Sequence, residues 1–256
     1  MPYANNNGIQ IHYEIDGTGP PLVLQHGFTG SIKDWRRSGY VEALRSSFQL
    51  IMVDARGHGL SDKPHNGDAY AIKEISSDVI SVLDASGITK AHYWGYSMGG
   101  RIGFGMAKHF PHRICSLILG GMHPYIRDPH ERNKQISSYQ RGMAAVVAEM
   151  ETRSGLLPPD RKNELLANDP AALAASTEAT RDDPGIQDVL SIMTMPCLVY
   201  VGVEDAAFYE GVARCVEEIS GAVFVPLPGL DHGLAFEHSH RILPQAKEFL
   251  NTARSS

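Results

Sequence analysis

Short apolar runs alternate with longer amphipathic segments along most of the chain. Strict alternation over residues 9–15 predicts a strand of an opening hairpin, and further apolar runs predict buried strands. We expect these strands at residues 22–25, 50–54, 92–95, 114–120, 197–202 and 223–227. Helical periodicity occurs between them, at residues 41–46, 71–86, 98–110, 209–219 and 234–252. Strands that alternate with helices favour a mostly parallel sheet with helices on both faces.

Residues 123–195 interrupt this alternation. They show no strand signal, and proline stands near the start of most of their helical patterns, as suits a first helical turn. We expect these helices at residues 129–153, 158–168, 170–180 and 185–193. The sequence therefore predicts a helical insertion, residues 123–195, in an α/β core formed by residues 1–122 and 196–256.

Length and charge limit the class of protein. A chain of 256 residues with 43% hydrophobic content suits one α/β core. The formal charge of −6 is spread along the chain, which argues against nucleic acid or an anionic membrane as partner. No run approaches the roughly 18 apolar residues of a membrane span, and the first residues lack a leader pattern. We expect a soluble cytoplasmic protein, as a monomer or a homodimer.

The motif Gly95-Tyr96-Ser97-Met98-Gly99 lies between a predicted strand and a predicted helix. So tight a turn leaves room only for glycine at the flanking positions and lifts the serine hydroxyl clear of the sheet. The plain alternative is a serine that caps the helix. A serine hydroxyl is a poor nucleophile at neutral pH, so a catalytic role requires a histidine base and a carboxylate that orients it.

Both partners are expected further along the chain. Asp205, with Glu204 as the neighbouring alternative, follows the predicted strand 197–202, and His232 lies in a polar loop after the strand 223–227. Open α/β sheets place their sites at such strand ends. The loop that contains Phe28 follows the strand 22–25, and its backbone N–H together with that of Met98 would form a two-donor oxyanion hole.

Over nearly its whole length the chain resembles the α/β-hydrolase superfamily, in particular compact bacterial ester and lactone hydrolases. The matching motifs occur in family order: His26-Gly27-Phe28, Asp54-Ala55-Arg56-Gly57-His58-Gly59, Gly95-Tyr96-Ser97-Met98-Gly99-Gly100, residues 202–205, and Asp231-His232-Gly233. The resemblance implies that Ser97, Asp205 and His232 are nucleophile, acid and base, with Phe28 and Met98 as oxyanion donors. It also implies an eight-stranded sheet and a small helical cap made by the insertion.

The segment that begins at Asp54 is expected to be structural. The resemblance and the turn-rich composition both indicate that Arg56 and His58 satisfy polar groups in the bend. We likewise expect His26 to brace its loop rather than to take part in the chemistry.

These features predict a serine hydrolase that cleaves carboxylic esters of short to medium acyl chain through an acyl-enzyme intermediate. A lactonase of the enol-lactone type and a carbon–carbon bond hydrolase of aromatic catabolism remain alternatives, because they use the same triad. A ligand-binding receptor without turnover is the alternative from another class. Glycine motifs for phosphates or dinucleotides are absent, and the histidines lack ligand spacing, so we expect no cofactor and no metal.

The substrate pocket is harder to locate, because apolar residues near the catalytic loops also suit the core. Residues that flank these loops or the start of the insertion are our candidates for its walls: Trp35, Met122, His123, Tyr125, Met143, Phe208 and Leu234. Such a lining favours an uncharged or weakly polar ester or lactone. His123, Arg127 and Arg132 could instead bind a carboxylate, although we favour a solvent-exposed position for them.

Overall fold

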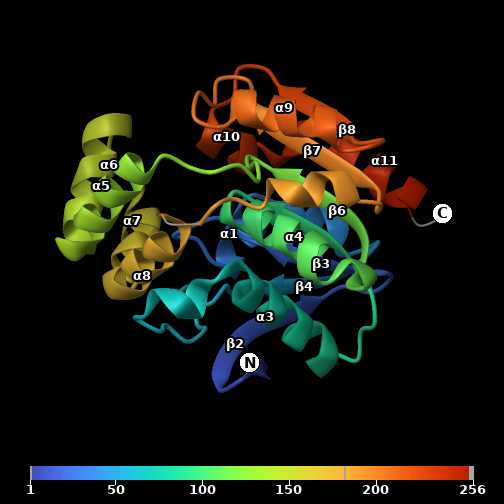
Figure 1. The fold of residues 1–256 in the computed structure, drawn as a ribbon, viewed down its shortest axis with the longest axis horizontal. Helices are drawn as coiled ribbons and strands as arrows, with labels where there is room; N and C mark the ends of the chain where they lie inside the picture. The colour runs from blue at the N-terminus through green and yellow to red at the C-terminus, as the bar shows by residue number, and fades with distance from the viewer. Residues whose placement is uncertain (1, 182, 254–256) are drawn as a thin grey trace.

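One eight-stranded sheet organises residues 2–181 and 183–253, which the computed structural model describes (Figure 1). Its order is β1-β2-β4-β3-β5-β6-β7-β8. The strands are β1 Tyr3–Asn6, β2 Ile9–Asp16, β3 Pro21–Gln25, β4 Gln49–Val53, β5 Ala91–Tyr96, β6 Ile114–Gly120, β7 Cys197–Gly202 and β8 Val223–Leu227. Strand β2 is antiparallel to β1 and β4, and β4, β3 and β5 to β8 are parallel. The predicted fold class is confirmed.

Helices cover both faces of this sheet. They are α1 Ile32–Arg37, α2 Tyr40–Leu44, α3 Ile72–Ala85, α4 Met98–His109, α9 Tyr209–Glu218, α10 His232–Glu237 and α11 Leu243–Ala253. Short 3₁₀ turns are η1 Gly67–Tyr70, η2 Pro111–Arg113 and η4 Ser239–Arg241. None of the helices in the described ranges has the length and the apolar character needed to cross a membrane.

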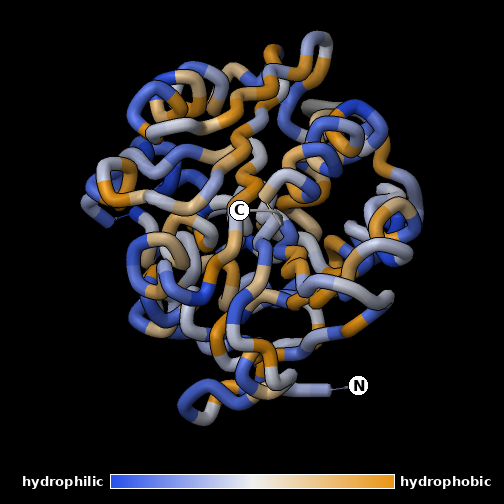
Figure 2. Tube along the Cα trace, turned by 90° about the vertical axis from the view of Figure 1, so that its right-hand side faces the viewer, coloured by the Kyte–Doolittle hydropathy of each residue, from blue (hydrophilic) through white to orange (hydrophobic). Residues whose placement is uncertain are grey.

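The central strands are buried on both faces. Along β3, Leu22 and Leu24 pack into one apolar cluster, whereas Val23 packs into another. Helices α3, α4 and α9 complete the cluster of Val23, and α1, α2, α10 and α11 complete the opposite one. Hydrophobic stretches accordingly run through the middle of the molecule in Figure 2. Burial on both faces explains why these strands appear in the sequence as continuous apolar runs.

The predicted insertion is helical and forms a lobe beside the sheet (Figure 1). Between β6 and β7 the described residues form α5 Pro129–Gln140, α6 Met143–Ser154, α7 Pro159–Leu166, α8 Pro170–Arg181 and the 3₁₀ turn η3 Gln187–Ile192. The single helix predicted over residues 129–153 is wrong, because Gly142 adopts a φ of 88° and separates α5 from α6. A positive φ is open to glycine and ends the helical path.

Helices α10, α11 and α1 also depart from the prediction. The helix predicted over residues 234–252 is divided into α10 and α11, with the turn η4 between them. Helix α1 was missed because it is only six residues long, although its start has a clear signal. Ser31 and Asp34 there form a capping box. The Ser31 hydroxyl accepts a hydrogen bond from the Lys33 N–H, and the Asp34 carboxylate accepts one from the Ser31 N–H.

A buried ion pair joins the bend after β4 to helix α3. Arg56 Nη2 lies 2.6 Å and Nε 3.0 Å from the two carboxylate oxygens of Asp78, and both side chains are almost fully buried. Arg56 Nη1 also donates to the Ala69 carbonyl at 2.7 Å, and Asn6 Nδ2 donates to Asp78 at 2.7 Å. Arg56 therefore has the structural role that we predicted for it.

Removal of the buried carboxylate should cost much more stability than removal of an exposed one from the same helix. We expect Asp78→Ala to lower the free energy of unfolding by about 3–5 kcal/mol, because it leaves a buried guanidinium without a counter-charge. Asp84→Ala is the matched control, since this carboxylate is mostly exposed and, among the described residues, its one side-chain partner is Arg113. Its cost should stay under about 1 kcal/mol. Equal costs in urea unfolding would contradict the structural role of the pair.

Candidate active site

Ser97 occupies a strained turn between β5 and α4. Its φ is 52° and its ψ −111°, and its side chain makes no capping hydrogen bond to the helix. A Cβ on Gly95 would lie 2.1 Å from the Gly99 carbonyl oxygen, and one on Gly99 would lie 2.1 Å from the Gln25 carbonyl oxygen. Both glycines are therefore required by close backbone approach, and the alternative of a helix-capping serine is wrong.

Three predicted residues from distant parts of the chain meet at this turn. His232 Nε2 lies 3.0 Å from Ser97 Oγ, and His232 Nδ1 lies 2.6 Å from Asp205 Oδ2. The carboxylate accepts from Nδ1–H, which leaves Nε2 free to accept the serine proton. Asp205 is buried after β7, whereas the neighbouring Glu204 is exposed, so the geometry selects Asp205.

The orientation of His232 is fixed from several sides. The ring of Phe208 stacks on it, with 4.7 Å between centroids and 22° between planes. The Tyr96 hydroxyl donates to the His232 carbonyl. One edge of the imidazole remains accessible, because the side chain is 36% exposed. The His232 ring is thus held in place while part of the side chain stays accessible.

The loop after β3 positions Phe28 near the serine. His26 accepts a hydrogen bond from the Ala55 N–H at Nε2 (3.0 Å), so its Nδ1–H donates to the Gly27 carbonyl (2.8 Å). This buried, fully bonded ring braces the loop as predicted. Within the described ranges, the backbone N–H groups of Phe28 and Met98 have no hydrogen-bond partner. They are therefore available to an incoming oxygen.

Ser97 and His232 open into a cavity of about 220 Å³, which we call the inner cavity. Met122 and Phe208 line it, as predicted, together with Phe28 and Met98. Residues that were not among our pocket candidates supply the remaining walls: Tyr70, Ile75, Arg101, Arg127, Arg132, Gln135, Ser176, Thr177 and Thr180. Most of these come from the insertion, whose packing against the core has no signal in local sequence.

Four pocket candidates lie elsewhere. Trp35 is fully buried among aromatic rings on the opposite face of the sheet, where it contacts Tyr40, Trp94 and Phe236. The other three are absent from the cavity lining for different reasons. Met143 packs inside the insertion, Tyr125 donates its hydroxyl to Glu218, and Leu234 is partly exposed on α10. Nearness in sequence to these loops therefore did not predict which side chains line the cavity.

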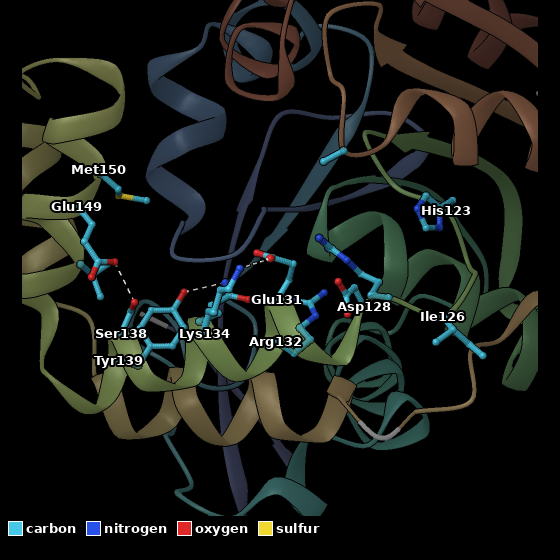
Figure 3. Close-up of a pocket in the computed structure, with 14 residues that line it drawn as sticks. His123, Ile126, Asp128, Glu131, Arg132, Lys134, Ser138, Tyr139, Glu149 and Met150 are labelled. Atoms are coloured by element: carbon cyan, nitrogen blue, oxygen red, sulfur yellow. Dashed lines mark hydrogen bonds and ion pairs between the residues drawn. The ribbon is translucent and has the colours of Figure 1, made fainter.

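A second cavity of about 600 Å³, the outer cavity, is lined mostly by residues of α5, of α6 and of the segment before α5 (Figure 3). His123 lines it, and its ring packs against Phe208 and Tyr125. Burial lowers the pKa of His123 to about 4, with help from Arg127 and Arg101, so this ring is neutral at pH 7. Arg127, Arg132 and Gln135 belong to both linings and stand between the two cavities.

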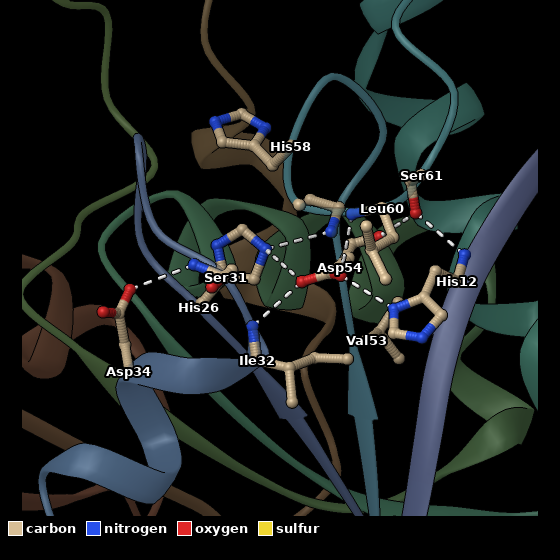
Figure 4. A network of polar contacts seen from close by, with 12 residues as sticks. His12, His26, Ser31, Ile32, Asp34, Val53, Asp54, His58, Leu60 and Ser61 are labelled. Atoms are coloured by element: carbon tan, nitrogen blue, oxygen red, sulfur yellow. Dashed lines mark hydrogen bonds and ion pairs between the residues drawn. The ribbon is translucent and has the colours of Figure 1, made fainter. Parts of the chain in front are cut away.

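A buried polar network stabilises the loops behind the site (Figure 4). Asp54 Oδ1 accepts from the Ile32 N–H at 2.9 Å, and Oδ2 accepts from His12 Nδ1 at 2.8 Å and from the Leu60 N–H at 3.0 Å. His58 bonds the Arg56 carbonyl, and burial lowers its pKa to about 3. The predicted structural roles of Asp54 and His58 agree with these contacts.

Fold and site together define a class. A serine at a strained strand-to-helix turn, bonded to a histidine and then to a carboxylate after later parallel strands, is the arrangement of α/β hydrolases. The sequence model of the family described as alpha/beta hydrolase fold matches residues 20–167, more than half of the chain. The chain belongs to this family, and this membership supports hydrolase activity.

Individual relatives differ in their reactions. The 3-oxoadipate enol-lactonase 1 of Acinetobacter baylyi is 26% identical over 79% of this chain and 78% of its own length. The crystal structure of an enol-lactonase from Burkholderia xenovorans LB400 matches 98% of this chain and 100% of its own, with a TM-score of 0.87 and 26% identity. A putative carbamate hydrolase of Azorhizobium caulinodans is 37% identical over 46% of this chain, and the match spans only 43% of that protein.

The close backbone approach at Gly99 can be tested directly. We expect Gly99→Ala to reduce stability by about 1–3 kcal/mol or more and to slow the labelling of Ser97 by a fluorophosphonate, since a methyl group there must displace backbone. Gly67→Ala is the control, because its Cβ would meet nothing nearer than 3.6 Å. Normal stability and normal labelling of Gly99→Ala would show that the turn is less tightly packed than described.

Proposed function

We propose that this protein is a serine hydrolase that cleaves carboxylic esters of short to medium acyl chain through an acyl-enzyme intermediate. The observation that supports it most directly is the continuous contact from Ser97 Oγ to His232 Nε2 and from His232 Nδ1 to buried Asp205. A serine in this arrangement loses its proton to the histidine as it attacks, and the carboxylate stabilises the imidazolium that forms.

In the first half of the reaction, Ser97 Oγ attacks the carbonyl carbon of the ester while His232 Nε2 takes its proton. The negative charge that develops on the carbonyl oxygen is stabilised by the N–H groups of Phe28 and Met98. Donors of this kind are already oriented before the reaction, and the loss of one typically costs about 100- to 1,000-fold in turnover. His232 then protonates the leaving alcohol as the intermediate collapses to an acyl-serine.

In the second half, water replaces the alcohol. His232 takes a proton from this water, which attacks the acyl-serine, and the same two N–H groups hold the second oxyanion. Return of the proton to Ser97 releases the acid. The helical insertion acts in this proposal as a cap, and the inner cavity of about 220 Å³ favours short to medium acyl groups.

A lactonase is the second candidate. The enol-lactonase relatives, which match this chain over most of its length, favour it. A lactone is an internal ester, so the same groups would perform the same steps, with the leaving alcohol still attached to the acyl group. What separates the two substrates is the shape of the cavity, and the triad is common to both.

Loss of the nucleophile should abolish turnover without unfolding the protein. We expect Ser97→Ala to reduce kcat on p-nitrophenyl esters, from acetyl to long chains, by on the order of 10⁴- to 10⁶-fold. The same assay should include several lactones and a vinylogous diketone acid, whose carbon–carbon bond the third class of enzyme would cleave. Near-normal turnover by this variant, with a melting temperature like that of the wild type, would contradict the proposed mechanism.

The choice of acid has its own test. Asp205→Asn should lower kcat by on the order of 10³- to 10⁴-fold, because the amide no longer stabilises the imidazolium or fixes its tautomer. Glu204→Gln is the matched control, since its carboxylate is exposed one residue away, and it should remain within about threefold of the wild type. The reverse pattern would assign the acid to Glu204.

A further inference from the structure

The inner cavity has an excess of positive charge. Arg101, Arg127 and Arg132 line it, and no aspartate or glutamate is among its lining residues. Arg101 is neutralised by an ion pair with Asp183. The other two arginines have no ion pair with any described residue. The half-buried position of Arg127 and Arg132 in a cavity wall differs from the solvent-exposed face that we expected for them.

Neither guanidinium is satisfied by the protein. Arg127 lies over the ring of Phe208, with 4.4 Å from Cζ to the ring centroid, and within the described residues it makes no hydrogen bond. Arg132 Nη1 donates to Gln135 Oε1 at 2.9 Å, but its Nε is buried without a partner. Buried donors are normally paired, so a buried N–H without a partner beside a cavity indicates that a ligand group accepts its hydrogen bond.

Nearby carboxylates do not supply a negative counter-charge for Arg127 and Arg132. Glu131 and Glu149 line the outer cavity, but Glu131 pairs with Lys134 and Glu149 pairs with Arg141. Glu131, Lys134 and Glu149 are labelled in Figure 3. Asp128 accepts the His130 N–H at the start of α5. Asp205 favours the charged form of Arg127, but its carboxylate is bonded to His232. Within the described residues, none of these four carboxylates forms an ion pair with Arg127 or Arg132.

Both arginines are charged at neutral pH despite their surroundings. Burial, with repulsion from Arg132 and Arg101, lowers the pKa of Arg127 to about 9. Burial and Arg101 lower the pKa of Arg132 to about 10. Partly buried cations that repel each other are unfavourable, and an anion bound between the two cavities would relieve both the repulsion and the lost hydration.

We propose that Arg127 and Arg132 bind a carboxylate of the substrate, so that the enzyme acts on esters or lactones that carry a second, free acid group. The hydrolysis in this inference rests on the proposed function, whereas the binding of a carboxylate does not. A planar guanidinium matches a carboxylate with two parallel hydrogen bonds, which arginine makes better than lysine. Hydrolysis would consume one water and leave the free acid group of the substrate unchanged.

The test compares esters that differ in charge. Monoethyl adipate is paired with diethyl adipate, and 4-acetoxybutanoate with butyl acetate, so that the acid group lies on the acyl side or on the alcohol side. We expect the wild type to prefer at least one acid ester over its neutral counterpart by about 10- to 100-fold in kcat/KM, the range expected for a charge-assisted contact. Arg127→Gln and Arg132→Gln should each reduce this preference at least about tenfold, and Arg132→Lys should reduce it less.

Arg45→Gln is the control for loss of one positive charge, because Arg45 is exposed and belongs to neither cavity lining. It should leave the preference unchanged. Hydrolysis of neutral and acid esters at equal rates, or a preference that persists in both glutamine variants, would overturn the proposal. Thermal melting curves identify any variant that fails to fold.

Binding separates this inference from the proposed reaction. Calorimetry with adipate and with 1,6-hexanediol, on the wild type and on Ser97→Ala, should show binding of the diacid alone, weakened about tenfold or more by either glutamine variant. Adipate binding without serine-dependent ester turnover would retain the carboxylate site and reject the esterase. Serine-dependent turnover with neither adipate binding nor acid preference would retain the esterase and reject the site.

Discussion

The close contact of three backbone segments at Ser97 is the constraint on which the rest of the site depends. Gly95 lets β5 turn directly into α4, and Gly99 lets that helix rest on the carbonyl of Gln25, where β3 ends. The Ser97 N–H bonds the Gly120 carbonyl at the end of β6, at 2.8 Å. Ser97 and the loop of Phe28 thus have fixed relative positions, which is what preorganised stabilisation of an oxyanion requires in the proposed mechanism.

The loops behind this contact are held by hydrogen bonds to one buried carboxylate. Asp54 is buried at the end of β4, and its two oxygens accept hydrogen bonds from β2, from the start of α1 and from the following bend. A Cβ on Gly59 would lie about 2.2 Å from that carboxylate, so the bend folds directly onto it. A buried carboxylate with several donors has one favourable geometry, and it therefore specifies the position of the loops around it.

Sequence periodicity and turn chemistry predicted the core well, because they are local. Strands β6, β7 and β8 were predicted with the observed bounds, and the order of Ser97, Asp205 and His232 was predicted from motifs at strand ends. The cavity walls were predicted poorly. Trp35 and Arg132 show why: an indole suits a core or a pocket equally, and an arginine on a polar helix faces solvent or a cavity according to how that helix packs. Only tertiary structure decides between these positions.

In the proposed function, the division between core and insertion separates chemistry from selectivity. In the proposed mechanism, Ser97, His232 and the two backbone donors act on the ester group, which every ester and lactone shares, and all of them come from the core. The groups that can distinguish substrates, including Arg127, Arg132 and Gln135, come from the insertion and stand at the passage between the cavities. Because two like charges there repel each other, an anionic substrate would gain binding free energy, under the proposed carboxylate site, that a neutral ester of the same shape would not. Under this proposal the insertion would set selectivity by charge while the core geometry stays the same.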